Sequence, residues 1–201
     1  MHNHLIMYST TLRCFLLSCL AVLTALIAQA AGPRRSTATG ITLTPVAMTF
    51  AIEEERLAHD VYTVALEQWE LPVFANIRRS ESQHVAALVQ LAGNFHLTVP
   101  AAHEGTYQTA ELQALYDDLI PLVMASEESA LLVGALIEET DIMDLRRTTT
   151  GITDATTKKV LANLEAASWH HLTAFVRNLS IRGIIYTPQV VDPDEFAARI
   201  R

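Results

Sequence analysis

Four long segments of the chain carry apolar residues every three or four positions, which is the spacing of a helix with one buried face. These segments lie at residues 45–69, 72–96 and 126–147, and from Asp154 to just before Gly183. Sustained strand-like alternation of apolar and polar residues is missing from the sequence, apart from a short stretch at 184–186. The hydrophobic pattern therefore predicts an all-α fold.

The breaks between these segments predict how the helices are connected. Residues 70–72 and 151–154 are short breaks, and a short connection makes two helices antiparallel neighbours. Residues 97–109 form a long polar crossover, followed by a shorter amphipathic helix at 110–124. A tail with two prolines ends in a short helical turn at 193–200. We expect a four-helix bundle made of two antiparallel hairpins, joined by a long crossover that carries a short extra helix.

Carboxylates and histidines stand on the apolar faces of these helices. Glu81 and His84 are three residues apart, so their side chains lie on the same side of the second helix. A buried carboxylate is costly unless it is paired, hydrogen-bonded or bound to metal. Helical bundles build dinuclear metal sites from Glu-x-x-His motifs and single glutamates on facing helices. The expected partners on the other helices are Glu55, Glu138, Asp141 and His171.

A simpler arrangement competes with metal binding at Glu81 and His84. The two side chains can form a hydrogen-bonded pair in the core, or Glu81 can form a salt bridge to Arg78 or Arg177. That alternative leaves His171, on a matching face of the fourth helix, without an explanation. The second histidine therefore favours a metal site.

Other charged residues near the site are expected to lie in solvent. Glu53 and Glu54 are predicted to be exposed charges that favour the start of the first helix. Glu54 replaces Glu55 as the ligand if that helix is rotated. Four further histidines are predicted to lie on the surface or in loops: His59, His96, His103 and His170.

The amino terminus is predicted to be a secretory signal peptide at residues 1–30. Arg13 precedes an uncharged apolar run from Cys14 to Ala31, which contains the small-x-small pattern of a cleavage site ending at Ala30. A retained membrane anchor is the alternative, although this run is short for spanning a bilayer. Residues 31–44 read as a flexible polar linker, which leaves 45–201 as one helical domain with a C-terminal tail. The mature protein is expected to be secreted or periplasmic and free of the membrane.

Cysteine content and charge exclude several kinds of site. Both cysteines, Cys14 and Cys19, lie in the predicted signal peptide. The mature chain is therefore expected to lack disulfides, cysteine-bound metal clusters and covalently attached haem. The sequence has 22 acidic and 14 basic residues, and this balance argues against a nucleic-acid partner. A metal site must then be built from His, Asp and Glu.

Several motifs also resemble a known family. Residues 55–62, ERLAHDVY, resemble the first helix of ferritins and rubrerythrins, in which a metal-bridging Glu precedes an inward Tyr by seven residues. From residue 50 to residue 190 the chain is similar to the exported ferritin-like family catalogued as domain of unknown function 2202. The motifs that carry this similarity are EEERLAHDVY, LPVF, SExxH, ELQALYDDL, VGALIEETDIMDL and NLxxxSxxHLTAFV.

The resemblance implies a ferritin-like fold and implies no activity, because that family is uncharacterised. Better-known di-iron relatives imply ligand positions at Glu55, Glu81, His84, Glu138 and His171. The chain departs from those relatives at Ser168, where their fourth helix carries a second ligating Glu. Either Asp141 supplies the missing carboxylate, or the site is asymmetric with one well-held and one weak metal position.

Charge and ligand type indicate what the site holds. Four carboxylates and two imidazoles carry a formal charge of about −4, which two divalent metal ions would balance. Oxygen-rich ligation with one His per metal suits iron first and manganese second. We expect Glu81 and Glu138 to bridge and His84 and His171 to hold one metal each. Glu55 and Asp141 are the expected terminal ligands.

The function predicted from these residues is that of an exported protein with a non-haem dinuclear metal centre, with iron as the expected metal. Such a centre would oxidise Fe(II) or reduce oxygen or peroxide, which are the expected partners besides the metal ions. The alternative is a binding or structural bundle that captures metal without turnover, or carries none. The residues leave open whether the protein is an enzyme. A monomer or homodimer is the default expectation.

Overall fold

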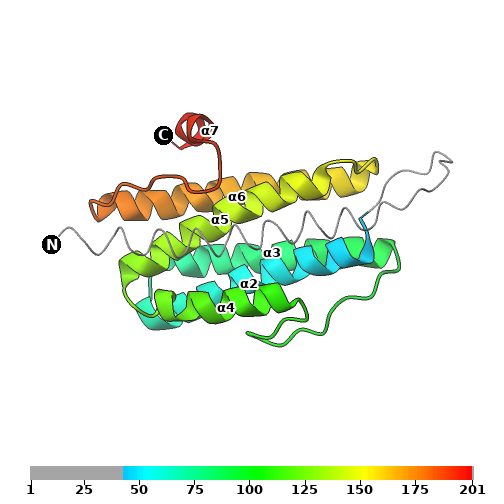
Figure 1. The fold of residues 1–201 in the computed structure, drawn as a ribbon, viewed down its shortest axis with the longest axis horizontal. Helices are drawn as coiled ribbons and strands as arrows, with labels where there is room; N and C mark the ends of the chain where they lie inside the picture. The colour runs from blue at the N-terminus through cyan, green and yellow to red at the C-terminus, as the bar shows by residue number, and fades with distance from the viewer. Residues whose placement is uncertain (1–42, 201) are drawn as a thin grey trace. The chain divides into compact units, whose positions relative to one another are not determined.

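The computed structural model describes residues 43–200, and these residues form six helices and no strand (Figure 1). The helices are α2 (Pro45–Trp69), α3 (Pro72–Asn94), α4 (Ala110–Val123), α5 (Glu127–Thr149), α6 (Ala155–Ile181) and α7 (Pro193–Arg199). The predicted all-α class is confirmed for this part of the chain, and the strand-like pattern at 184–186 forms no strand. The predicted signal peptide at 1–30 lies outside the described residues, as does most of the predicted linker at 31–44. None of the six helices is long and apolar enough to cross a membrane.

Local side-chain chemistry explains where the helices begin and end. Thr44 caps α2 by accepting a hydrogen bond from the Ala47 amide, and Ser126 and Asp154 cap α5 and α6 in the same way. Glu70 ends α2 in a left-handed backbone conformation, and Pro72 starts α3 two residues later. The predicted helix start at Ser126 is therefore confirmed.

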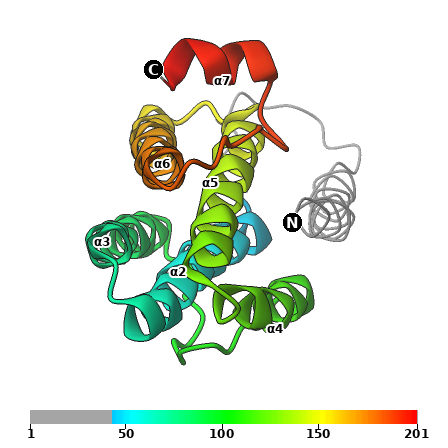
Figure 2. The ribbon, with the colours of Figure 1, turned by 90° about the vertical axis from the view of Figure 1, so that its left-hand side faces the viewer.

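The four long helices α2, α3, α5 and α6 pack in two hairpins. α2 packs on α3 and α5 packs on α6, while α2 also contacts α5 and α3 contacts α6 (Figure 2). The shorter helix α4 lies in the long connection between the hairpins and packs on α2 and α5. As a result, 14 of the 23 residues of α5 are buried.

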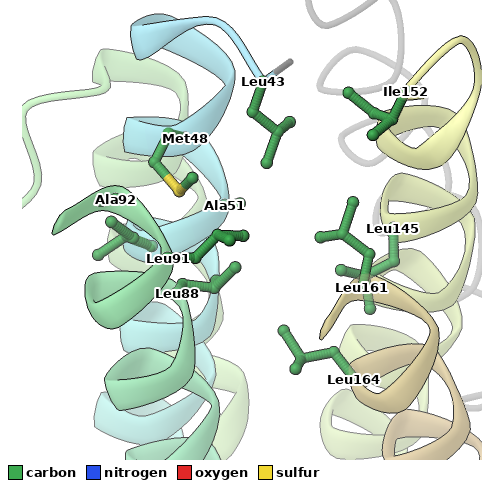
Figure 3. Packing of buried hydrophobic residues seen from close by; sticks show 11 residues of the cluster. Leu43, Met48, Ala51, Leu88, Leu91, Ala92, Leu145, Ile152, Leu161 and Leu164 are labelled. Carbon is green, nitrogen blue, oxygen red and sulfur yellow. The ribbon is translucent and has the colours of Figure 1, made fainter. Parts of the chain in front are cut away.

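Two apolar layers enclose the middle of the four long helices. One is a cluster that includes Met48, Leu88, Leu145 and Leu161, from α2, α3, α5 and α6 respectively (Figure 3). The other is a group of three buried rings, Tyr62, Phe74 and Phe175, whose centroids lie 5.3 to 6.1 Å apart. On α2, α3 and α6 the residues predicted to bind metal fall between these two layers in sequence.

Candidate metal centre

All six residues that were predicted as metal ligands are buried between the two apolar layers. Their exposed fractions are 8% or less, and each of the four long helices contributes at least one of them. We call these residues the carboxylate–histidine cluster: Glu55 from α2, Glu81 and His84 from α3, Glu138 and Asp141 from α5, and His171 from α6.

Five of the six form two groups that each offer three ligand atoms within 4.8 Å of one another. The first group is Glu55, Glu81 and His84, and the second is Glu81, Glu138 and His171. Glu81 belongs to both groups, whereas Asp141 belongs to neither. Each group therefore has two carboxylates and one imidazole, and the two groups share a carboxylate.

Both imidazoles turn the same ring nitrogen, Nδ1, toward the shared carboxylate. His84 Nδ1 lies 2.7 Å from Glu81 Oε2 and 3.1 Å from Glu55 Oε2. His171 Nδ1 lies 2.9 Å from Glu81 Oε1 and 3.3 Å from Glu138 Oε2. The two rings stack with centroids 5.4 Å apart. Each carboxylate oxygen of Glu81 therefore contacts a different histidine.

Without a metal ion, protons on the imidazoles balance part of the negative charge. Burial lowers the pKa of His84, but contacts with Glu55 and Glu81 outweigh it and raise that pKa to about 11. For His171, burial is likewise outweighed by the nearby Glu138 and Glu81, which raise its pKa to about 10. Burial raises the pKa of Glu81, but its contacts with both imidazoles lower it to about 2. Glu81 is thus the carboxylate that stays ionised.

The other three carboxyl groups of the cluster hold their protons more tightly than usual. Burial, followed by the charge of Asp141, raises the pKa of Glu55 well above its ordinary value. Burial also raises the pKa of Glu138. For Asp141, burial and the charge of Glu138 raise the pKa to about 7. Two imidazolium ions are therefore too little positive charge for four buried carboxylates.

Several buried atoms of the cluster also have no hydrogen-bond partner among the described residues. They are Glu55 Oε1, Glu81 Oε1 and His171 Nδ1. The last two lie 2.9 Å apart, so their contact is close but lacks hydrogen-bond geometry. Buried polar atoms are rarely left unpaired, and lone pairs that meet at one place suit a shared cation. The donor set, rich in oxygen with one imidazole per group, could therefore hold a metal ion.

Position 168, where the resemblance to di-iron proteins predicts a second ligating glutamate, is occupied by a serine that contacts Asp141. Ser168 is fully buried, and its Oγ donates a hydrogen bond of 2.5 Å to Asp141 Oδ2. Asp141 lines a small cavity together with Glu55, Glu81 and Glu138. Ser168 thus holds a carboxylate of α5 next to both groups.

Tyr62 contacts the cluster from the aromatic layer. Its hydroxyl donates a hydrogen bond of 2.6 Å to Glu138 Oε1, and its ring is fully buried. Burial and the charge of Glu138 raise the pKa of Tyr62 well above its ordinary value, so the phenol keeps its proton. Tyr62 therefore fixes the orientation of Glu138, as a buried hydrogen-bond donor beside a metal ligand does.

Two expectations for nearby charges were wrong. Glu53 is fully buried rather than exposed, and its carboxylate accepts hydrogen bonds of 2.7 and 2.9 Å from the amides of Gln108 and Thr109. Because α2 begins at Pro45, Glu53 lies in the third turn and faces the crossover rather than solvent. Glu54 is half-buried and belongs to neither group.

The competing salt bridge is also absent from the described residues, since no ion pair joins Glu81 to Arg78 or Arg177 within 43–200. His170, by contrast, is exposed as predicted.

One buried carboxylate with a clear structural role was not predicted from the sequence. Glu139 is fully buried, and it accepts hydrogen bonds from the Tyr186 hydroxyl and from the amides of Gln189, Val190 and Val191. It therefore attaches the C-terminal tail to α5. Helical periodicity gave no signal for it, because α5 is buried on several sides.

Comparison with known proteins identifies relatives but no activity. A family model described as an uncharacterized protein domain (DUF2202) matches residues 46–201. The uncharacterized protein MJ0754 of Methanocaldococcus jannaschii is 36% identical over 146 residues, which cover 72% of this chain and 79% of that protein. A crystal structure described as hypothetical protein MJ0754 from Methanococcus jannaschii DSM 2661 matches with a TM-score of 0.76 and 32% identity. That match covers 82% of this chain and 97% of the solved one.

Proposed function

The chain belongs to the family of the uncharacterized protein domain DUF2202, and we propose that it is a ferritin-like four-helix protein that binds a non-haem dinuclear metal centre. The observation that carries the proposal is the pair of buried ligand groups that share Glu81. Its four long helices, with one crossover between two hairpins, follow the plan on which such centres are built.

The charge of the cluster supports two metal ions. Two divalent cations would balance the negative charge of four ionised carboxylates. Two imidazolium ions would balance only half of that charge. Oxygen-rich ligation with a single imidazole per group suits iron first and manganese second.

The residues take specific roles in this proposal. Glu55 and His84 hold one metal ion, Glu138 and His171 hold the other, and Glu81 serves both. Glu138 belongs to one group only, so it becomes a terminal ligand rather than the second bridge expected from the sequence. Asp141 belongs to neither group, but it lines the cavity beside Glu55, Glu81 and Glu138 and could serve there as a further terminal ligand.

Hydrogen bonds and apolar packing hold the carboxylates of the cluster in place. Bound iron would supply the electron transfer needed to oxidise Fe(II) or to reduce oxygen or peroxide. Tyr62 holds Glu138, and Ser168 holds Asp141. The apolar layers on both sides keep bulk water away, which strengthens the electrostatic attraction between the carboxylates and a cation.

Metal stoichiometry and oxygen uptake test this function. We expect about two metal ions per chain, with oxygen consumption and a rise in near-ultraviolet absorbance after Fe(II) is added. Glu81→Gln should lose both signals, whereas His170→Gln on the exposed side of α6 should keep them. Two bound metals without oxygen uptake would support the non-catalytic alternative. No bound metal in the parent protein would refute the proposal.

We also retain export as part of the proposal. Cleavage of a signal peptide after Ala30 would leave a mature chain that begins at Ala31. Mass spectrometry of the protein recovered from a secreting host tests this cleavage, and an intact amino terminus in a membrane fraction would favour the anchor.

A further inference from the structure

A small cavity lies beside the carboxylate–histidine cluster, between α2 and α5. It is lined by the four cluster carboxylates together with Glu54 and Ala58 of α2 and Ile137 of α5. Six of these seven residues are buried, with exposed fractions of 8% or less, whereas Glu54 is half-buried. Glu54 is therefore the lining residue with the greatest exposure to solvent.

The lining of this cavity selects for positive charge. Every polar side chain that lines it is a carboxylate, and the unpaired atoms Glu55 Oε1 and Glu81 Oε1 belong to buried members of that lining. Carboxylates in a narrow, poorly hydrated opening attract cations and repel anions. Ala58 and Ile137 supply the apolar part of the wall, and Ala58 is small enough to leave space.

Apolar and imidazole side chains lie around other parts of the cluster. The apolar cluster and the three aromatic rings close the two ends along the helices. On the side of α3 and α6, the stacked rings of His84 and His171 contact the carboxylates of the cluster. A route on that side would require both rings to move.

We infer that divalent metal ions enter the site between α2 and α5, and that Glu54 is the first carboxylate they meet. This inference rests on the proposed function, because it assumes that the cluster binds metal. Glu54 acts here as a transit residue rather than a ligand, since it belongs to neither ligand group. Arg147 lies close enough for its charge to interact with that of Glu54. The other six lining residues include four carboxylates and no basic group, so the lining as a whole stays negative.

The rate of metal uptake tests this route separately from the site itself. Metal-free mature protein is mixed with Co(II) in a stopped-flow instrument, and the absorbance of bound Co(II) gives the association rate. Glu54→Gln keeps the shape and removes the charge, and we expect it to slow association about fivefold. Ala58→Leu narrows the opening and should slow association further. Glu67→Gln, at an exposed position of the same helix, is the matched control and should leave the rate unchanged.

Equilibrium stoichiometry separates the outcomes. The route is supported if Glu54→Gln binds slowly but reaches the parent stoichiometry and affinity. If Glu54→Gln binds at the parent rate, the route is wrong, while the proposed metal site still stands. If this variant loses affinity instead of rate, Glu54 is a ligand and its role as a transit residue is wrong. Failure of the parent protein to bind Co(II) at all would refute the proposed function. Because Glu54→Gln is isosteric, the test stands even if Ala58→Leu fails to fold.

Discussion

Metal uptake at neutral pH should expel at least two protons per chain, because both imidazoles of the cluster are protonated when no metal is bound. The pKa of His84 is raised to about 11 and that of His171 to about 10, so each ring carries a proton at pH 7. A metal ion binds the neutral imidazole, and each proton must therefore leave. Asp141, with a pKa of about 7, adds about half a proton. The expected total is therefore about two and a half protons, and the raised pKa values of Glu55 and Glu138 act in the direction of a larger release.

This release makes metal affinity strongly dependent on pH. When binding expels two protons, affinity rises about 100-fold per pH unit. Calorimetric titration with Mn(II) in buffers of different ionisation enthalpy measures the number of protons directly. His171→Gln should lower the count by about one, and His170→Gln, next to it but exposed, should leave it unchanged. Release of less than one proton while two metal ions bind would show that the imidazoles are neutral before metal binds. That result would refute the predicted protonation of His84 and His171.

The same protons predict how the metal-free protein responds to pH. His84 and His171 have folded-state pKa values above the ordinary 6.5. Their contribution to stability is therefore complete below pH 6.5 and is lost as the pH rises toward about 10 to 11. Asp141 changes stability in the same direction, because its pKa is raised from 3.8 to about 7. Its contribution to stability is therefore lost as the pH rises from about 3.8 to about 7. Glu81, with a pKa of about 2, contributes equally at all pH values above about 4.5. We expect a lower melting temperature at pH 9 than at pH 6 after chelation, and the opposite order would contradict this assignment of charge.

Three further changes test the surroundings of the site. Ser168→Ala removes the donor to Asp141, a carboxylate beside both ligand groups, and should weaken metal binding about 10- to 100-fold in a Mn(II) titration followed by electron paramagnetic resonance. Unchanged binding would leave Ser168 without a role. Gly134→Ala would place a Cβ atom 2.6 Å from the ring of Phe175, and we expect a loss of about 1–3 kcal/mol in urea unfolding; full stability would mean that the ring moves freely. Glu139→Gln should speed proteolysis of the tail after residue 183 without changing metal stoichiometry, whereas equal cleavage rates would show that the tail is held elsewhere.

Much of the helical framework could be predicted from the sequence alone. The predicted starts at Pro45, Pro72 and Ala110 match the structure, and so does the cap at Ser126. These features depend on residues within one or two turns of each other, so local chemistry is sufficient to determine them. The same holds for placing Glu81 and His84 on one face, since helix geometry alone brings them together.

The sequence did not reveal burial by distant segments. Glu53 and Glu139 look like surface charges beside their inward neighbours, but the crossover and the tail fold over them and supply backbone amides. Periodicity identifies one buried face of a helix and fails when a helix such as α5 is covered on several sides.

What the sequence by itself determined is therefore which residues are helical and which side chains face inward. Only the tertiary structure decided that Glu81 serves both ligand groups, that Glu138 serves one, and that Asp141 lies beside Ser168. The physical reason is that a metal site depends on distances of a few ångströms between side chains of different helices. Those distances are set by how the helices pack against one another, which the order of residues within any single helix does not determine.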